Sequence, residues 1–493
     1  MVVLTTQSDD VFHEAEELLR LFLGMTAVRA QEQEGGSVDY RITIDTHYEQ
    51  GRWYAEARDE LHDVPPQSAS YPFLGDSPLL QRRARSRAVK FALFSLMKKL
   101  LPESYTPWGA LTGIRPTKLL YEYISGGMQP VEAARILVRD YGVRQDKVAI
   151  LLDIEQMQRG YRCSLKNYML DVYIGIPFCP SRCEYCSFAS CDVHKFGALR
   201  EPYLEALFTE MRMMRAYMDE CGLKTGNLYI GGGTPTALED DQLVRLLKAC
   251  RAFVPESGEF TLEAGRPDTI TREKLAAAKE YGVSRLSVNP QSMHDATLEK
   301  IGRKHRAQQI REAFALAREM GFHNINMDLI AGLSGETTEM FSSSLESVID
   351  LAPENVTVHT LSIKRSSILH ENLSENRPTP PEDVDRMVQD ALHRLGAGGW
   401  RPYYLYRQKY MSGNLENVGY AKPGTQCLYN IDVMEETHSN LAMGAGAITK
   451  WFDPEANVIR RAANVKNVQE YIDRCEQMAQ KKIALAREMF PEE

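Results

Sequence analysis

The most informative segment of this chain is Tyr173-Ile-Gly-Ile-Pro-Phe-Cys179-Pro-Ser-Arg-Cys183-Glu-Tyr-Cys186-Ser-Phe188. It begins as an apolar strand and continues as a loop that carries three cysteines with the spacing C-x3-C-x2-C. Three thiolates so close together can bind three irons of a cubic iron–sulfur cluster and leave the fourth iron open. A structural zinc site normally has four closed ligands, often two separated cysteine pairs, and the sequence has no second C-x2-C pair. The stretch therefore predicts an iron–sulfur cluster on a loop that follows a strand.

Other uses of these cysteines stay open. They could form a zinc knuckle completed by Cys191 or by a distant histidine, or remain reduced thiols without a metal. We interpret Cys191, which lies five residues beyond Cys186, as a bystander. The remaining cysteines show no ligand spacing and are expected to be ordinary packing residues: Cys163, Cys221, Cys250, Cys427 and Cys475.

Apolar strands alternate with amphipathic helices on both sides of the strand–loop junction. The expected strands span residues 171–178, 227–231, 259–265, 285–291, 324–333 and 356–363. Helical periodicity lies between them, for example over 202–218, 240–253 and 337–351. Six such units predict an α/β fold with a parallel sheet, and they suit a partial (β/α)6 barrel better than a closed eight-fold one. Catalytic groups are then expected at the C-terminal ends of the strands.

Two further regions flank this barrel. The N-terminal part reads as a helix over 11–23, a hairpin around Gln50-Gly51, and helices over 83–101, 117–124, 130–141 and 146–160. We expect an N-terminal α+β domain at 1–165 and the barrel at 166–370. A segment rich in polar residues and proline at 371–381 predicts a boundary before a mixed C-terminal region at 371–493.

Length and composition limit the class of protein. A chain of 493 residues exceeds the roughly 250 to 300 over which single cores grow, so two or three packed units are expected. Its 58 basic and 67 acidic residues give a formal charge of −9, which offers no general attraction for nucleic acid. No apolar run approaches the roughly 20 residues of a membrane span. The odd number of cysteines, nine, argues against a disulfide framework, so we expect a cytoplasmic protein.

The cysteine loop on a six-unit barrel resembles the radical S-adenosylmethionine (SAM) superfamily. The motifs Tyr-x-x-x-Pro-Phe-Cys, Gly231-Gly-Gly-Thr-Pro-Thr236 and Met327-Asp-Leu-Ile-Ala-Gly-Leu333 resemble its oxygen-independent coproporphyrinogen III oxidase branch. The segment Trp108-Gly-Ala-Leu-Thr-Gly-Ile-Arg-Pro-Thr-Lys118 is most similar to HemZ members of that branch. The likeness covers about residues 168–370, and it continues more weakly to the C-terminus.

The resemblance implies a cofactor set and a group of ligand-binding residues. Cys179, Cys183 and Cys186 would bind a [4Fe–4S] cluster, and its open iron would bind the amino and carboxylate groups of SAM. Family positions that bind SAM fall on Tyr173, Tyr185, Gly232, Gly233, Thr234, Glu263, Gln291, Arg303, Asp328 and Ile448. The family binds two SAM molecules, and Gln291, Arg303 and Asp328 would lie near the second.

Residue chemistry is compatible with these positions. Gly231, Gly232 and Gly233 lack side chains, so a ligand can approach the backbone there. Glu263, Gln291 and Asp328 lie near the ends of predicted strands, where polar groups face the mouth of a barrel. Lone histidines are more often structural, so His359, His370 and His438 are left out of the predicted site.

The resemblance also implies an activity. A reduced cluster and SAM would generate a 5′-deoxyadenosyl radical, and two propionates of coproporphyrinogen III would each lose a β-hydrogen and CO2 to give protoporphyrinogen IX. The implied partners are this tetrapyrrole and a one-electron donor such as flavodoxin or ferredoxin.

The sequence differs at two places from the motifs of its relatives, so alternative functions stay open. Some members of the branch carry a further cysteine where this chain has Phe188, and the haem-chaperone signature His-Asn-x-x-Tyr-Trp is replaced by Tyr429-Asn-Ile-Asp-Val-Met-Glu-Glu436. A haem-binding carrier of the HemW type and radical SAM chemistry on another tetrapyrrole are the alternative hypotheses.

Overall fold

The computed structural model of the chain divides into two compact units. Unit 1 comprises residues 1–152 and 413–415, and unit 2 comprises residues 153–412 and 416–493. The structure describes residues 1–490 except 24–26, 31–34, 74–76, 114, 163–168, 189, 256–257, 365–366, 368, 370–377, 409–410, 455 and 457. The expected boundary at 165 lies inside unit 2, and the expected boundary at 370 separates residues that belong to one unit.

Unit 1 is built on a five-stranded sheet with the order β2-β1-β3-β4-β5. The first strand is parallel to both of its neighbours, and the other pairings are antiparallel. The strands are β1 (Val2–Thr6), β2 (Ala27–Arg29), β3 (Tyr40–Glu49), β4 (Arg52–Asp59) and β5 (Gln67–Pro72). The expected hairpin is therefore the β3–β4 pair, which turns at Gln50 and Gly51, both with positive φ.

The described helices of unit 1 are α1 (Asp9–Leu23), α2 (Pro78–Leu100), α3 (Pro116–Ser125) and α4 (Pro130–Arg139). Helix α5 (Gln145–Arg162) begins in unit 1 and ends in unit 2. Proline stands in the first turn of α2, α3 and α4, where its missing N–H costs no hydrogen bond. The apolar stripes of α1 and α2 bury Leu18, Leu19, Leu93 and Leu96 against the sheet core.

Unit 2 contains the predicted partial (β/α)6 barrel. Its parallel strands are β6 (Met169–Ile176), β9 (Lys224–Gly232), β10 (Phe260–Glu263), β11 (Arg285–Ser287), β12 (Ile325–Ala331) and β13 (Asn355–Thr360). They lie in this order in one sheet, each beside the next. Strand β11 ends earlier than the sequence pattern predicts, because Pro290 offers no N–H and Gln291 has a φ of 68°.

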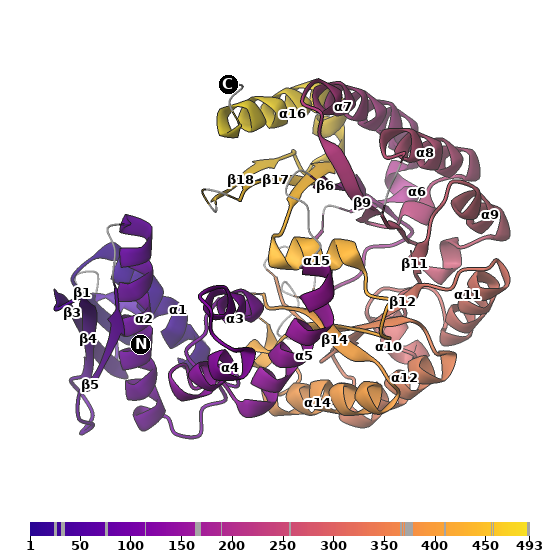
Figure 1. Cartoon of the computed structure of the whole chain (residues 1–493). Helices are drawn as coiled ribbons and strands as arrows, with labels where there is room; N and C mark the ends of the chain where they lie inside the picture. Colours follow the sequence, from indigo (N-terminus) through magenta and orange to yellow (C-terminus); the bar gives the residue numbers. More distant parts are fainter. Residues whose placement is uncertain are drawn as a thin grey trace. The chain divides into compact units, whose positions relative to one another are not determined.

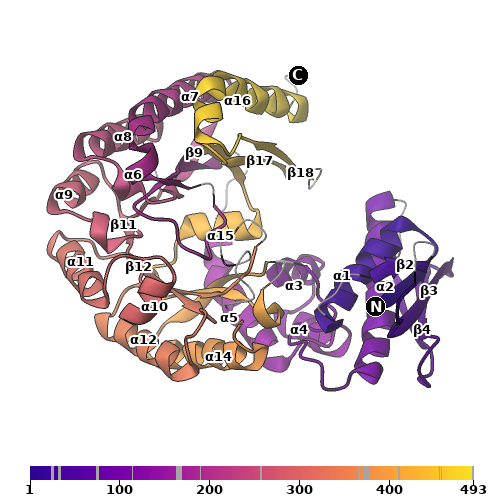
Figure 2. The same cartoon turned by 180° about the vertical axis from the view of Figure 1, so that it is seen from behind.

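Helices cover the outside of this sheet, as the arc in Figures 1 and 2 shows. They are α7 (Arg200–Glu220), α8 (Asp240–Phe253), α9 (Arg272–Glu280), α10 (Asp295–Lys300), α11 (Ala307–Glu319), α12 (Thr338–Leu351) and α14 (Pro381–Ala397), with the single-turn α6 (Val193–Phe196) before them. In the part of the chain that the structure describes, none of the helices combines the length and apolar character needed to cross a bilayer.

The C-terminal residues extend the same sheet at both edges, giving eleven strands in all. Strand β15 (Asn417–Ala421) pairs antiparallel with β13, and β14 (Arg401–Tyr406) pairs antiparallel with β15 at the edge. Strand β16 (Ser439–Met443) lies parallel beside β6, followed by β17 (Ile448–Asp453) and β18 (Val458–Ala463). Two helices complete the region, α15 (Leu428–Glu435) and α16 (Val468–Met489).

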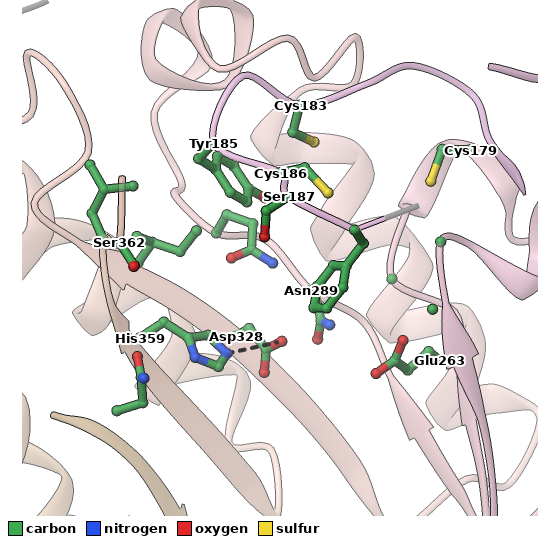
Figure 3. Close-up of a pocket in the computed structure, with 18 of the residues that line it drawn as sticks. Cys179, Cys183, Tyr185, Cys186, Ser187, Glu263, Asn289, Asp328, His359 and Ser362 are labelled. Atoms are coloured by element: carbon green, nitrogen blue, oxygen red, sulfur yellow. Dashed lines mark ion pairs between the residues drawn. The ribbon is translucent and has the colours of Figure 1, made fainter. Parts of the chain in front are cut away.

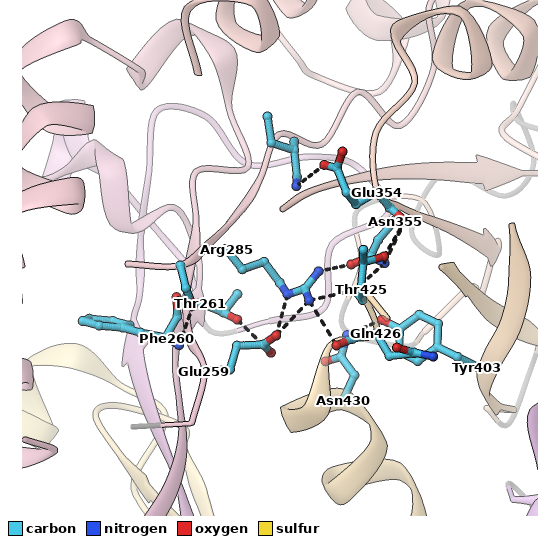
Figure 4. A network of polar contacts seen from close by, with 12 residues as sticks. Glu259, Phe260, Thr261, Arg285, Glu354, Asn355, Tyr403, Thr425, Gln426 and Asn430 are labelled. Carbon is cyan, nitrogen blue, oxygen red and sulfur yellow. Dashed lines mark hydrogen bonds and ion pairs between the residues drawn. The ribbon is translucent and has the colours of Figure 1, made fainter. Parts of the chain in front are cut away.

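A buried polar network occupies the N-terminal end of the barrel strands (Figure 4). Arg285, only 2% exposed, donates to Glu259 Oε2 from Nε at 3.0 Å and from Nη2 at 2.8 Å. It also contacts Asn355 and the carbonyl oxygens of Thr425 and Gln426. A buried ion pair is tolerated only when its hydrogen bonds are satisfied, and this network satisfies them from three strand starts and the segment before residue 428. The opposite end of the strands carries the candidate site.

Candidate functional site at the C-terminal strand ends

The cysteine loop is closed at its base by backbone pairing. After β6, the two-residue strand β7 (Phe178–Cys179) pairs in parallel with β8 (Cys191–Asp192), and Cys191 N donates to Pro177 O at 2.6 Å. A tight turn inside the loop brings Cys186 N within 3.1 Å of Cys183 O. The loop therefore presents Cys179, Cys183 and Cys186 to one pocket, whereas Cys191 lies in β8 and is not among the described residues that line it.

The surroundings of the three sulfurs fit an anionic metal cluster. Arg266, 2% exposed, places Nη1 at 3.7 Å from Cys183 Sγ, and the Thr234 hydroxyl donates to Cys179 Sγ at 3.5 Å. Burial raises the pKa of the Cys179 thiol to about 12, so this sulfur ionises when a metal binds rather than alone. Three converging thiols with a buried guanidinium beside them are the donor set that an iron–sulfur cluster with one open corner needs.

The glycine turn after β9 approaches the cysteine loop so closely that side chains are excluded. A Cβ on Gly233 would lie 2.8 Å from Phe178 O, 2.9 Å from Ile176 O and 3.0 Å from Cys179 Sγ. Gly232 has a φ of +106°, a conformation that residues with a Cβ rarely adopt. The turn thus leaves bare backbone facing the pocket next to the first cysteine.

Glu263 ends β10 and faces this glycine turn. Its Oε1 accepts a hydrogen bond of 2.5 Å from Tyr229 OH, and its other oxygen lies 2.8 Å from the position of a Cβ on Gly231. Burial raises the pKa of Glu263 to about 7, with a smaller contribution from the charge of Asp328. A cationic ligand group bound beside this carboxylate would lower that pKa again and gain an ion pair.

Asp328 and His359 form a second polar pair across the pocket, on β12 and β13 (Figure 3). His359 Nε2 lies 3.6 Å from Asp328 Oδ2, and Asn326 donates to Asp328 Oδ1 at 2.7 Å. Burial raises the pKa of Asp328, but the hydrogen bond and charge of His359 outweigh it, so the net pKa is lowered. Asp328 is therefore a carboxylate at neutral pH.

Buried amide groups with unused hydrogen-bonding capacity lie between these features. Arg303 donates from Nη1 to Asn289 O at 2.5 Å, and its Nη2 lies 3.5 Å from Tyr185 OH. Asn289 Oδ1 and Gln291 Oε1 are buried and have no partner among the described residues. Unpaired buried amides are costly unless a ligand or water satisfies them, so these two oxygens mark ligand-facing positions.

The structure brings most of the predicted site residues into this one pocket. Its lining includes Cys179, Cys183, Tyr185, Cys186, Gly232, Gly233, Thr234, Glu263, Gln291, Arg303 and Asp328. Tyr173 is not in the lining, and a Cβ on Gly232 would lie 3.4 Å from its hydroxyl, which places that hydroxyl beside the glycine turn. Ile448 is not in the lining either: it is 46% exposed at the start of β17, and β16 separates that strand from β6.

Sequence reasoning missed several residues of the pocket. His359 is left out there as a lone histidine, although it lies inside the predicted strand 356–363, and that position was the available signal. Asn289 also lies inside a predicted strand, 285–291, and Arg266 and Lys364 directly follow predicted strands. Tyr406 had no signal, because the path of its segment depends on tertiary packing. His370 lies outside the described residues.

The chain is similar to a known protein family, to individual proteins and to solved structures. The family described as the radical SAM superfamily matches residues 173–348. The oxygen-independent coproporphyrinogen-III oxidase-like protein HemZ of Bacillus subtilis is 40% identical over 388 residues, which is 78% of this chain and 77% of that protein. The heme chaperone HemW of Bacillus subtilis is 34% identical over 287 residues, 57% of this chain and 70% of HemW. The solved structure of coproporphyrinogen III oxidase HemN from Escherichia coli covers 66% of this chain and 73% of its own, with a TM-score of 0.49 and 23% identity.

The partial barrel and its three-cysteine pocket are those of the radical SAM class. Within that class, the identity to HemZ extends over most of both proteins. The chain therefore belongs to the HemN/HemZ-like family of radical SAM proteins. Membership implies a [4Fe–4S] cluster and SAM as cofactors, which agrees with the donor set described above.

Proposed function

We propose that this protein converts coproporphyrinogen III to protoporphyrinogen IX by radical SAM oxidative decarboxylation, as a step of anaerobic haem biosynthesis. The observation that carries the proposal is the meeting of three thiols, Glu263 and the Asp328–His359 pair in one pocket, in a chain 40% identical to a coproporphyrinogen-III oxidase-like protein. The proposal includes a cytoplasmic location. The described cysteines are free thiols, and the reducing cytosol keeps thiols in this state.

In this proposal the cysteine loop holds the cluster, and the residues beside it hold the nucleoside. A reduced cluster with SAM supplies a 5′-deoxyadenosyl radical that removes hydrogen from an unactivated carbon. The bare backbone of the Gly232–Gly233 turn and the Glu263 carboxylate accept the ammonium group of SAM. The unpaired oxygen of Asn289 accepts a hydrogen bond from a hydroxyl group of a ribose.

The pocket also suits an anionic substrate. Lys364 lines it, and burial lowers the pKa of its ammonium group, so a bound carboxylate would raise that pKa again. His359 offers a second donor next to Asp328. We assign these groups to the propionates of the tetrapyrrole, and Gln291, Arg303 and Asp328 to a second SAM molecule. Enclosure of the reacting carbon excludes water, which protects a radical from side reactions.

An anaerobic product assay tests the proposal. Cluster-reconstituted protein is incubated with SAM, coproporphyrinogen III and either dithionite or reduced flavodoxin. We expect protoporphyrinogen IX and 5′-deoxyadenosine, and neither product from the Cys179→Ala variant. SAM cleavage without any decarboxylated tetrapyrrole would reject the proposed substrate and leave the radical SAM assignment intact.

A haem carrier is the second candidate function. It is favoured by the 34% identity to the heme chaperone HemW and by Phe188, a 68% exposed aromatic residue at the rim of the pocket where some family members carry cysteine. Stoichiometric haem binding and transfer to an apo-haemoprotein, without SAM consumption, would support the carrier. SAM cleavage that depends on haem or on another porphyrin would indicate chemistry on a different tetrapyrrole.

A further inference from the structure

Two buried aspartates and a histidine converge at the end of the barrel opposite the cysteine loop. Asp171 lies near the start of β6, Asp432 lies in α15, and His438 immediately precedes β16. One potential ligand atom from each residue lies within 4.8 Å of the other two. Asp171 is 2% exposed, and the side chains of Asp432 and His438 are 1% and 8% exposed. The radical SAM chemistry uses none of these residues.

The neighbours of these carboxylates supply little positive charge. Asp171 Oδ1 accepts from Asn227 N at 2.8 Å, and Asp432 accepts from Tyr161 OH at 2.5 Å and from Thr437 Oγ1 at 2.6 Å. These donors are neutral, and among the described residues His438, with Nδ1 at 3.3 Å from Asp432 Oδ1, is the ionisable base in contact with the pair. Two ionised carboxylates in a buried site repel each other strongly. Burial and the charge of Asp432 therefore raise the pKa of Asp171, and a cation between the two groups would let both ionise.

Unused ligand atoms at the same place point to that cation. Asp171 Oδ2 is buried and accepts no hydrogen bond from any described residue. Asn440, which is paired in register with Asp171 across β16 and β6, also has a buried Oδ1 without a described partner. Side chains of registered neighbours point to the same face of a sheet, so two oxygen acceptors without donors lie side by side. Such groups are normally satisfied by a donor, a water or a metal ion.

We propose that Asp171, Asp432 and His438 bind a divalent transition-metal ion that fastens α15 and β16 to the first barrel strand. Carboxylate oxygen and imidazole nitrogen are donors that Zn²⁺ accepts, and Asn440 Oδ1 is placed to act as a fourth oxygen. The ion would join β6 to α15 and β16, which follow much later in the sequence, and its charge would balance the two carboxylates. This structural site is independent of the SAM pocket and of the tetrapyrrole.

The test uses the cluster-loaded full-length protein. It is dialysed against a chelator and titrated with Zn²⁺, and bound zinc and iron are counted per chain. We expect one zinc in addition to the cluster irons, together with a higher melting temperature. His438→Gln and Asp171→Asn should each weaken zinc binding at least about tenfold. His62→Gln is the matched control, because His62 faces Asp59 at 2.6 Å in unit 1 with no such cluster around it, and its zinc binding should equal that of the wild type.

The cysteines are the competing zinc site, and Co²⁺ distinguishes the two. Cobalt bound by thiolates gives an intense sulfur-to-metal charge-transfer band, whereas cobalt on carboxylates and imidazole gives only weak visible bands. Weak visible bands from the wild-type protein at one equivalent of Co²⁺ support the proposal. This measurement needs no variant, so it holds even where a variant does not fold. The proposal would be overturned if the wild-type protein retained neither zinc nor cobalt, or if bound cobalt gave a thiolate band. An unchanged zinc affinity in folded His438→Gln would overturn it as well.

Discussion

Substituting Gly233 with alanine is the sharpest test of the site geometry. The new methyl group would approach Phe178 O, Ile176 O and Cys179 Sγ at 2.8, 2.9 and 3.0 Å, whereas ordinary contacts begin near 3.4 Å. Both carbonyl oxygens are hydrogen-bonded to the same turn, because Gly233 N donates to Ile176 O and Thr234 N donates to Phe178 O, each at 2.8 Å. Relieving the overlap must therefore shift the backbone that leads into Cys179, the first cluster ligand.

The expected loss follows from the size of the overlap. Relieving it requires displacements of about 0.4 to 0.6 Å, and overpacking of this kind costs roughly 1–3 kcal/mol. If that strain falls on cluster binding, it corresponds to roughly a fivefold to hundredfold loss, since about 1.4 kcal/mol is a factor of ten. We expect Gly233→Ala to lower iron content and SAM cleavage by this amount while the far-ultraviolet circular dichroism stays unchanged.

Gly265→Ala is the matched control for this prediction. Gly265 lines the same pocket, but a Cβ there would meet only Asn289 Nδ2, at an ordinary 3.6 Å. Its iron content and SAM cleavage should stay within about twofold of the wild type. If Gly233→Ala and Gly265→Ala both retain full cluster occupancy and cleavage, the close approach of the glycine turn to Cys179 is wrong.

Three further predictions follow from the pocket. Replacing Cys186 with alanine should abolish the visible absorption of the cluster and all SAM cleavage, and retained cleavage would contradict its assignment as a ligand. Glu263 binds a proton in the folded protein up to about pH 7 but only to about pH 4.5 when unfolded, so its contribution to stability falls as pH rises through that window. Melting temperatures measured without SAM should therefore decline with pH less steeply for Glu263→Gln than for the wild type. Parallel curves of melting temperature against pH for the two proteins would refute the raised pKa of Glu263. Replacing His359 with glutamine should raise the pKa of Asp328, so the acid limb of the product-formation profile should move to higher pH, and an unmoved limb would show that Asp328 does not control it.

The barrel was predictable because its signals are local. Each parallel strand is buried on both faces and reads as a short apolar run, and the cysteine loop and the glycine turn are contiguous in sequence. Glu263 and Asp328 were found because they are polar residues inside such runs. Their common pocket follows from the topology, since parallel strands end at the same edge of a sheet.

The remaining features depend on long-range packing. Strands β14 to β18 gave no clear signal, because whether a short apolar segment joins a sheet is decided by an edge elsewhere in the chain. The unpaired oxygens of Asn289 and Gln291 arise from a turn with a positive φ at Gln291, which its sequence does not announce. His438 was noted as a lone histidine, and only the fold brings it beside Asp432 and Asp171.

The pairing of β16 with β6 sets an order of events during synthesis. The ribosome makes the chain from its N-terminus, so the strand leading into the cysteine loop emerges long before residues 439–443, which cover its open edge. Until then that edge offers unpaired N–H and C=O groups to other nascent chains. The barrel sheet is therefore closed at this edge only after translation is nearly complete, and a ribosome stalled upstream of residue 439 would leave the edge of β6 exposed.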